Sequence, residues 1–397
     1  MSGLAEELQE RLAAFEAQGL RRRLAAVDSA QGARIQVEGR SLLNFSSNDY
    51  LGLANDPILK TASACAVERF GAGAGASRLL CGSLTPYHEL EESLAAFKGT
   101  EAALVFSSGY ATALGTIPAL VGKDDLVVVD KLVHACIVDA ARLSGAKLRV
   151  FAHNDVEDLE SILAWGLARA ASKGVARTAR TLVITESLFS MDGDQAPLRD
   201  IVQLKERCGA WLMVDEAHAT GLFGERRRGL AEAQGVADRI DIHMGTLGKA
   251  LGAAGGYICG SRALIDFLVN RARSFLFSTA PVPAAAAAAE AGVRFVQSDA
   301  GERRCAQLWA RIAEFRRSSA SDEAARRGPI IPLHVGDETE AVDLATRLRE
   351  RGLFIPAIRY PTVARRKARL RLTLSAAHTA EDVQRLRAEL TALGRTL

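Results

Sequence analysis

Short, continuous apolar runs that alternate with helical stretches constrain the fold of this chain more than any other feature. An apolar run without polar alternation is typical of a strand buried on both faces. Such strands alternating with helices indicate a mainly parallel sheet. The sequence therefore predicts an α/β fold whose ligands bind at the carboxyl ends of the strands. The predicted strands are residues 102–106, 126–130, 148–151, 181–185, 211–215, 240–245 and 256–259.

The N-terminal segment has other patterns. Residues 1–19 alternate Leu and Ala with glutamates, which predicts an acidic amphipathic helix. Residues 34–45 are predicted to form a hairpin that turns at Glu38-Gly39. We therefore expect residues 1–45 to form a segment distinct from the sheet.

The C-terminal third returns to mixed elements. Pro281 and Pro283 precede six alanines, which predicts a long helix that bridges two domains. Beyond it, short strands alternate with helices, which indicates a small C-terminal α+β unit. We expect a large domain over residues 46–290 and a small domain over 291–397. The predicted strands of the small domain are 330–335, 353–358 and 370–374, and its helices are 340–351 and 380–393.

Composition narrows the classes of function. Charged residues make up 24% of the 397 residues and the formal net charge is only +3, which does not favour nucleic acid or an anionic membrane as a partner. No apolar run reaches the length of a membrane span, and the N-terminus lacks the pattern of an export signal. The six cysteines form no C-x-x-C pair. We therefore expect a cytoplasmic protein without a disulfide framework or a metal site.

Asp215 and His218 are candidate functional residues because they follow a predicted strand at the edge where ligands bind. The sequence Asp-Glu-Ala-His at 215–218 also occurs in helicases, and an aspartate after a strand often only caps a helix. A helicase requires the phosphate loop G-x-x-x-x-G-K-[ST], which the sequence around Lys249 does not supply. The motif alone leaves a structural and a functional role open.

Two further signals follow predicted strands. Lys249 stands between Gly248 and Gly252. Glycines allow a bulky ligand to approach, and apolar neighbours disfavour the ammonium form, so the amine is available as a nucleophile. Ser108-Gly109-Tyr110 turns from a strand into a helix, whose free N–H groups can hold a phosphate. Such a turn is common and carries little weight alone.

Together these signals predict pyridoxal phosphate. That cofactor needs a lysine for its aldehyde, an anion site for its phosphate and a carboxylate facing its pyridinium nitrogen. Asp215 suits the last role, since a buried carboxylate keeps the ring nitrogen protonated. His218 is placed to hydrogen-bond the phenolic oxygen, and His134 is placed to cover the ring face.

Three stretches resemble motifs of the α-oxoamine synthases, a branch of the fold type I pyridoxal-phosphate enzymes. The resemblance covers the chain from about residue 20 to its C-terminus. It implies a large mainly parallel-sheet domain with a small C-terminal α+β domain, a homodimer, and a Schiff base at Lys249. The stretches are Asn-Phe-Ser-Ser-Asn-Asp-Tyr-Leu-Gly-Leu at 44–53, Phe-Ser-Met-Asp-Gly-Asp at 189–194 and Thr-Leu-Gly-Lys at 246–249.

Residues 215–221, 277–281 and 358–363 resemble the branch that condenses L-alanine with a pimeloyl thioester in biotin biosynthesis. Glycine C-acetyltransferases usually have Asp-Asp-Ser-His at the first of these, so Glu216 and Ala217 argue against them. The resemblance implies that Lys249 anchors the cofactor and then removes the α-proton before carbon dioxide is lost. The thioester carrier is coenzyme A or acyl carrier protein. A glycine-using synthase, an aminotransferase and a non-enzymatic binding protein remain alternatives.

The resemblance also implies roles for single residues. Gly109 and Tyr110 would hold the phosphate, and His134 would stack on the ring. Arg371 is similar to the arginine that pairs with the amino-acid carboxylate, a role suited to a bidentate donor. The basic run at 365–367 is either a solvated loop or a contact for the carrier. The further candidates are Ser108, Glu186, Ser190, His218 and Thr246 for the cofactor, and Arg21, Asn48 and Thr362 for substrate.

Overall fold

The computed structural model describes residues 3–172, 179–316 and 328–395. The chain divides into two compact units, and each is described by itself. Unit 1 consists of Met1–Gly52, Met191–Gly193 and Ala306–Leu397, and unit 2 consists of Leu53–Ser190 and Asp194–Cys305. Among the described residues, none of the helices combines the length and the apolar character that crossing a bilayer requires.

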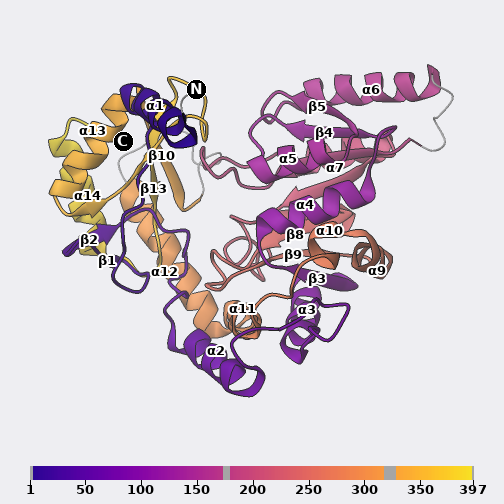
Figure 1. Cartoon of the computed structure of the whole chain (residues 1–397), viewed down its shortest axis with the longest axis horizontal. Coiled ribbons are helices and arrows are strands. Elements are labelled where there is room, and N and C mark those ends of the chain that lie inside the picture. Colours follow the sequence, from indigo (N-terminus) through magenta and orange to yellow (C-terminus); the bar gives the residue numbers. More distant parts are fainter. Residues whose placement is uncertain (1–2, 173–178, 317–327, 396–397) are drawn as a thin grey trace. The chain divides into compact units, whose positions relative to one another are not determined.

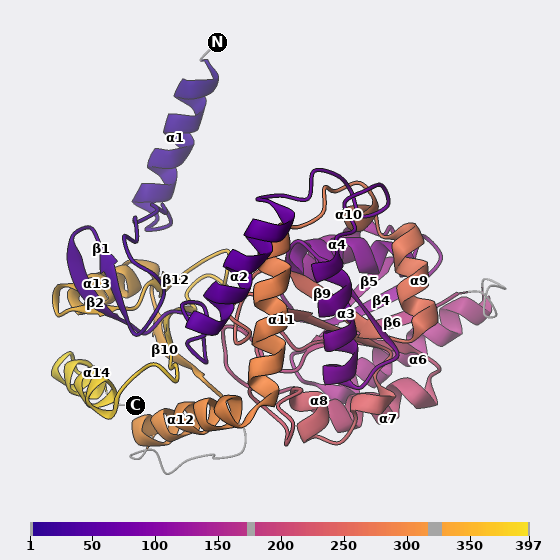
Figure 2. The same ribbon diagram turned by 90° about the horizontal axis from the view of Figure 1, so that it is seen from below.

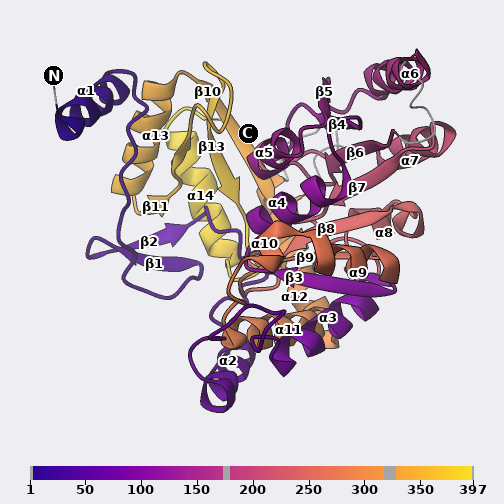
Figure 3. The ribbon, with the colours of Figure 1, turned by 45° about the vertical axis from the view of Figure 1, so that its right-hand side comes forward.

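A seven-stranded sheet forms the centre of unit 2 (Figures 1 and 3). Neighbouring strands are parallel except where β9 pairs, antiparallel, with β3 and β8. The prediction of a mainly parallel sheet is therefore confirmed. The order across the sheet is β3 (Ala102–Phe106), β9 (Gly256–Gly260), β8 (Ile242–Thr246), β7 (Trp211–Asp215), β6 (Thr181–Glu186), β4 (Leu126–Asp130) and β5 (Lys147–Phe151).

Helices cover this sheet, which explains the continuous apolar runs. Leu104, Val129 and Ile184 pack in one cluster with residues of α4 (Gly109–Leu120), α5 (Ala135–Leu143), α9 (Arg262–Arg271) and α10 (Arg273–Leu276). Their strand neighbours Val105 and Val128 are also buried, so strand residues of both orientations leave water. The remaining elements of unit 2 are α2 (Pro57–Phe70), α3 (Thr85–Lys98), α6 (Val156–Ser172), α7 (Leu198–Arg207), α8 (Leu230–Ala233) and the 3-10 helix η1 (Ala237–Arg239).

The alanine run forms helix α11 (Pro283–Gln297), with proline in its first turn as predicted. Figure 2 shows α11 between α2 and α3, all within unit 2. A Cβ at Gly292 of α11 would lie 2.3 Å from the carbonyl oxygen of Leu251, so the helix packs closely on the segment after Lys249. The prediction that this helix bridges two domains is wrong. The chain passes from unit 2 to unit 1 within the next helix, α12 (Asp299–Arg316), after Cys305.

Unit 1 contains two three-stranded sheets. The predicted hairpin is confirmed as β1 (Arg34–Val37) and β2 (Arg40–Asn44), with Glu38 and Gly39 at positive φ in the turn. The second sheet has β13 (Ala368–Thr373) between β10 (Ile330–Gly336) and β12 (Ala357–Ile358). The helices of unit 1 outside α12 are α1 (Leu4–Ala17), α13 (Glu338–Glu350) and α14 (Ala380–Ala392).

One predicted strand of unit 1 is two. Residues 353–358 form β11 (Leu353–Phe354), which pairs with β2, and β12, which pairs with β13. Pro356 lies between them and has no N–H to donate to a ladder, so one continuous strand is disfavoured.

Candidate active site

The carboxyl ends of the parallel strands of unit 2 place most of the predicted cofactor residues along one edge of the sheet. Glu186 and Asp215 are register partners at the ends of β6 and β7. Phe106 of β3 and Thr246 of β8 both pair with Gly256 of β9, so the residues after β3 continue at the same edge. The predicted residues that follow these strand ends are Ser108, Gly109, Tyr110, His134, Ser190, His218 and Lys249.

Lys249 and His218 contact each other. The Nζ atom of Lys249 lies 2.8 Å from Nε2 of His218, and the histidine is buried while the lysine is half-buried. A lysine amine that shares a hydrogen bond with an imidazole has a partner that both accepts and donates, depending on the tautomer. The pair can therefore hold a proton on either side of this contact.

Two buried carboxylates lie near this amine. Burial raises the pKa of Asp215, and the charge of Lys249 opposes that shift. Burial also raises the pKa of Glu186 to about 8, with Asp215 adding to the shift and Lys249 opposing it. The strands bring the two acids side by side in a setting where both cannot easily be charged. A cation placed between them would be strongly favoured.

His134 is the N-cap of α5, and its Nδ1 accepts the backbone N–H of Cys136 at 3.2 Å. Burial lowers the pKa of His134, although the charge of Asp215 opposes the shift. The imidazole is therefore neutral near pH 7, with its proton on Nε2. A neutral ring at the edge of the sheet suits the predicted stacking role.

The start of α4 offers amide donors. Ser108 is its N-cap: the side chain accepts the N–H of Ala111, and the carbonyl accepts the N–H of Thr112. The first N–H groups of a helix have no partner within the helix, which leaves those of Gly109 and Tyr110 for a ligand. A Cβ at Gly256 would lie 2.7 Å from both N and Cα of Gly109. Only glycine at 256 allows α4 to begin so close to β9.

The glycines around Lys249 do two different things. Gly252 has φ +70° and a Cβ there would lie 2.5 Å from the Cβ of Leu53, so this glycine is required by backbone conformation and packing. Gly248 has space beside it, its nearest neighbour being the Ala253 carbonyl at 3.5 Å. The Thr246 hydroxyl donates to the Gly255 carbonyl at 2.9 Å and so fixes the same loop.

Lys98 was not predicted as a site residue, yet it contacts Glu216, the residue that follows Asp215. Its Nζ donates to Oε2 of Glu216 at 2.6 Å, and the Lys98 and Glu216 side chains are 2% and 1% exposed. Oε1 of Glu216 accepts the N–H of Ala231 at 2.9 Å. The two partners are 118 residues apart, so no local signal could find the pair. Asp139, which accepts from the Tyr110 hydroxyl, was missed for the same reason.

The predicted substrate residues belong to unit 1 and are described there. Arg371 is 6% exposed on β13, and its guanidinium donates to Asn48 Oδ1 at 3.0 Å, to Thr373 Oγ1 at 3.2 Å and to the Tyr50 hydroxyl at 3.3 Å. Asn48 and Arg371 are therefore brought together. Arg21 pairs with Glu16 at 3.3 Å, and Thr362 is exposed after the cis peptide bond between Tyr360 and Pro361.

The groups at the edge of the unit 2 sheet fit pyridoxal phosphate. Lys249 supplies an amine, Asp215 a buried carboxylate, and the start of α4 supplies amide donors, which are the groups that the aldehyde, ring nitrogen and phosphate require. Oε1 of Glu186 is buried and has no hydrogen-bond partner among the described residues. A buried acceptor without a partner indicates that a bound group completes the site.

Comparison with known proteins decides the family. The pattern of the family "Aminotransferase class I and II" matches residues 40–390. An 8-amino-7-oxononanoate synthase of Anaeromyxobacter sp. (strain K) is 50% identical over 98% of this chain and 96% of that protein. Another, from Geobacter sulfurreducens, is 46% identical over 99% of this chain and 98% of that protein. The chain belongs to the 8-amino-7-oxononanoate synthase family.

Solved structures agree with membership of the 8-amino-7-oxononanoate synthase family. Serine palmitoyltransferase of Sphingomonas wittichii has a TM-score of 0.88 at 31% identity, with 99% of each chain covered. A structure of SPT with a PLP internal aldimine has a TM-score of 0.89 at 28% identity, with 100% of each chain covered. The predicted fold class, the family resemblance and the pyridoxal phosphate cofactor are confirmed. The chain is a pyridoxal-phosphate-dependent acyltransferase.

Proposed function

We propose that this enzyme condenses L-alanine with a pimeloyl thioester to give 8-amino-7-oxononanoate, carbon dioxide and the free thiol carrier. The observation that carries the proposal is the position of Lys249, 2.8 Å from His218 and next to buried acids. The names of relatives 43–53% identical to this chain support the choice of reaction. Pyridoxal phosphate, when bound, supplies the aldehyde for the amine and the electron-withdrawing ring that makes the α-carbon acidic.

Lys249 would act twice. Its Nζ would hold the aldehyde of the cofactor, and as a free amine it would be the base that takes the α-proton of L-alanine. His218 at 2.8 Å keeps that amine in place and shares its proton. The same amine would return a proton to the product carbon.

Asp215 would hold the proton on the ring nitrogen. Burial disfavours its charged form, so a cationic N–H facing the carboxylate is strongly bound and both groups remain charged. His134, a neutral imidazole on the exposed side of the site, would cover the ring face and exclude water from it. The amides of Gly109 and Tyr110 would bind the phosphate.

Arg371 would bind the alanine carboxylate. Asn48, Thr373 and Tyr50 orient its guanidinium through their side-chain oxygens, and a planar guanidinium held in this way is suited to a carboxylate. Arg21 and Thr362 would help to bind the acyl substrate. The exposed run at 365–367 is a further place for the phosphates of coenzyme A or for an acyl carrier protein. We further propose a homodimer that acts in the cytoplasm.

The test is a matrix of purified enzyme with L-alanine, glycine or L-serine against pimeloyl, acetyl, succinyl and palmitoyl thioesters. Mass analysis of products should find 8-amino-7-oxononanoate as the main product, with the Lys249→Ala variant as the blank. One methyl group is worth about 1–3 kcal/mol in an apolar pocket, so preference over glycine is expected to be modest. A preference for glycine with acetyl thioester would make the enzyme a glycine C-acetyltransferase, and amino transfer without loss of carbon dioxide would make it an aminotransferase.

A further inference from the structure

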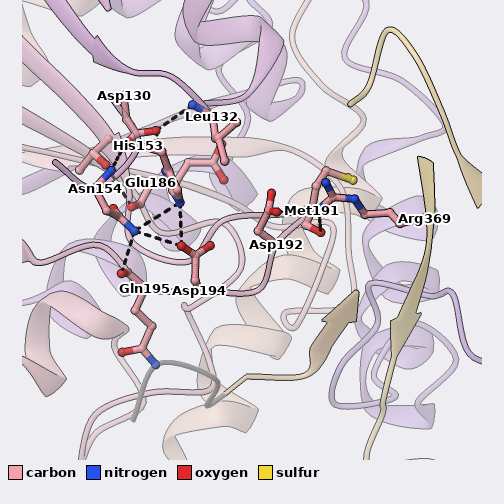
Figure 4. Close-up of polar contacts among 11 residues, drawn as sticks. Asp130, Leu132, His153, Asn154, Glu186, Met191, Asp192, Asp194, Gln195 and Arg369 are labelled. Carbon is pink, nitrogen blue, oxygen red and sulfur yellow. Dashed lines mark hydrogen bonds and ion pairs between the residues drawn. The ribbon is translucent and has the colours of Figure 1, made fainter. Parts of the chain in front are cut away.

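His153 lies between two carboxylates of unit 2, beyond the residues that sequence motifs single out. Its Nδ1 is 2.9 Å from Oδ1 of Asp130, and its Nε2 is 2.7 Å from Oδ2 of Asp194 (Figure 4). The Asp130 side chain is 0% exposed and that of His153 is 24% exposed. The imidazole therefore connects two segments that are far apart in the sequence, with a fully buried partner at one end and a partner that is 31% exposed, Asp194, at the other.

The charge of this imidazole follows from its partners. Burial alone would lower the pKa of His153, but hydrogen bonds and charge from Asp130 and Asp194 raise it to about 10. Both ring nitrogens then carry protons at neutral pH, and each donates to one carboxylate. The edge of the ring also packs against Phe189, with centroids 4.4 Å apart. His153 is therefore a fixed cationic link and not a free base.

One end of this link is the turn that presents His134. Asp130 ends β4, and its Oδ1 also accepts the N–H of Leu132 at 2.7 Å, which closes the turn two residues before His134. Oδ2 of Asp130 accepts the N–H of Asn154 at 2.8 Å. Every movement of this carboxylate would therefore shift the turn that begins α5.

The other end is the loop that carries Ser190. The backbone N–H of Phe189 donates to the carbonyl of Asp194 at 3.0 Å, which closes the loop around Ser190. Asn154 reinforces the contact, because its Nδ2 donates to Oδ2 of Asp194 at 3.1 Å and to the Gln195 carbonyl at 3.2 Å (Figure 4).

The same two segments meet a second time at Glu186. Hydrogen bonds from the backbone amides of His134 and Ser190 lower the pKa of this carboxyl, against the larger effect of burial. The backbone amides of both segments therefore lie near the Glu186 carboxyl at the end of β6. The hydrogen bonds that connect the segments are those of His153, through the side chains of Asp130 and Asp194.

We propose that His153 is a positioning residue for the cofactor site: through Asp130 and Asp194 it fixes the His134 turn against the Ser190 loop. It would act through these two aspartates and not through a contact of its own with the cofactor. Its effect is to keep the ring of His134 and the hydroxyl of Ser190 at the spacing that the cofactor requires, since a displacement of a supporting group by a fraction of an ångström weakens such a site. This inference rests on the cofactor part of the proposed function and not on the choice of amino acid or thioester.

The experiment titrates apoprotein with pyridoxal phosphate and follows absorbance and visible circular dichroism of the bound cofactor. His153→Gln keeps the side chain polar but removes the charge and one donor. We expect its Kd for pyridoxal phosphate to rise roughly 10- to 100-fold, the range typical when groups that orient a ligating residue are removed. The circular dichroism band should weaken, because the cofactor is held less rigidly. His153→Arg, which keeps a cation with several donors, should recover part of the affinity.

His88→Gln is the matched control, since it makes the same change at an exposed histidine of unit 2 and should leave both signals unchanged. Unfolding of each apoprotein in urea separates positioning from stability. Wild-type affinity and circular dichroism in folded His153→Gln would overturn the proposal, whatever its free energy of unfolding. If that variant does not fold, Asp194→Asn removes one end of the link and should give a smaller loss, and wild-type signals there would overturn it equally. Failure of the thioester matrix would leave these binding results untouched.

Discussion

Two lysines of unit 2 differ in the kind of side chain that they contact: Lys98 contacts a carboxylate and Lys249 contacts an imidazole. Lys98 donates to Glu216 at 2.6 Å, and both side chains are almost completely buried. Lys249 is half-buried, its contact at 2.8 Å is with the imidazole of His218, and the acids near it have raised pKa values. The charges of Lys98 and Glu216 neutralise each other within the protein. Near Lys249, by contrast, the buried acids can still be neutralised by a cationic group of a ligand.

Asp215 and Glu216 make the difference explicit, because they are adjacent in sequence and both buried. Burial would raise the pKa of each. For Glu216 the charge of Lys98 and hydrogen bonds reverse the shift and lower the pKa to about 2, whereas for Asp215 burial prevails. A buried acid with its own cation supports the fold, and a buried acid without a dedicated cation is available to a cationic group of a cofactor. Variants of both kinds can test this division.

The largest effect is expected at Lys249. Lys249→Ala should abolish condensation, because it removes the amine that lies beside His218, while the free energy of unfolding changes by no more than about 1 kcal/mol. Borohydride reduction followed by peptide mapping should label Lys249 in the wild type. A label on Lys131 or Lys123 instead would refute the assignment of the anchor.

Lys98→Met should lower stability and leave cofactor binding by the folded protein intact. Removing one partner leaves Glu216 buried without its cation, so we expect a loss of about 3–5 kcal/mol in the free energy of unfolding. Molecules that remain folded should still bind pyridoxal phosphate. The control is Lys98→Met combined with Glu216→Leu, which removes both charges and should recover much of the stability. An unchanged urea midpoint for the single variant would contradict the structural role of this pair.

Asp215→Asn should keep the fold and lower turnover by at least ~100-fold, or about 3 kcal/mol of barrier, as the ring nitrogen loses its charged partner. Glu216→Gln sharpens the contrast at the next position, because it should reduce stability while turnover per folded molecule stays near that of the wild type. Near-normal turnover in Asp215→Asn would reduce Asp215 to a helix cap.

The smallest expected effect is on the pH dependence of the free energy of unfolding, which should differ between Glu186 and Glu216. Glu186 has its folded pKa raised to about 8 from 4.5, so its contribution increases the apoprotein's free energy of unfolding as pH falls from 8 toward 4.5. Glu216 has its folded pKa lowered to about 2, so its contribution is present above pH 4.5 and is lost as pH falls from 4.5 toward 2. Urea unfolding across both windows should show each slope, on the order of 1–2 kcal/mol per pH unit. Glu186→Gln should reduce the slope in the upper window and leave the lower one unchanged, and Glu216→Gln should do the opposite.

Much of unit 2 was predictable because its signals are local. An apolar run followed by Asp215 or Lys249 contains both the strand and the candidate residue at its end, and the ends of parallel strands lie at the same edge of the sheet. Glycines near Lys249 were predicted as a feature of ligand approach, yet Gly252 packs against Leu53 and only Gly248 has space beside it. The local sequence shows where the glycines are, but not which residues pack against them in the folded protein.

The rest depended on contacts between distant segments. In the sequence, Lys98 is only the last residue of a helix. Its role becomes visible in the structure, where it contacts Glu216. Asp130 ends its strand as Asp215 does, and that common position was the one available signal for the His153 link. The alanine helix satisfied every local rule, and only packing against α2 and α3 placed it inside unit 2.

The close approach of Gly256 to Gly109 has a consequence for engineering. A methyl group at position 256 would overlap the first residue of α4, so that helix start has no freedom to retreat toward β9. If the cofactor phosphate binds at this helix start, as we propose, a substitution of Gly256 would not make room for a larger phosphate group. A library for an altered phosphate should therefore keep Gly256 and vary exposed positions such as Tyr110.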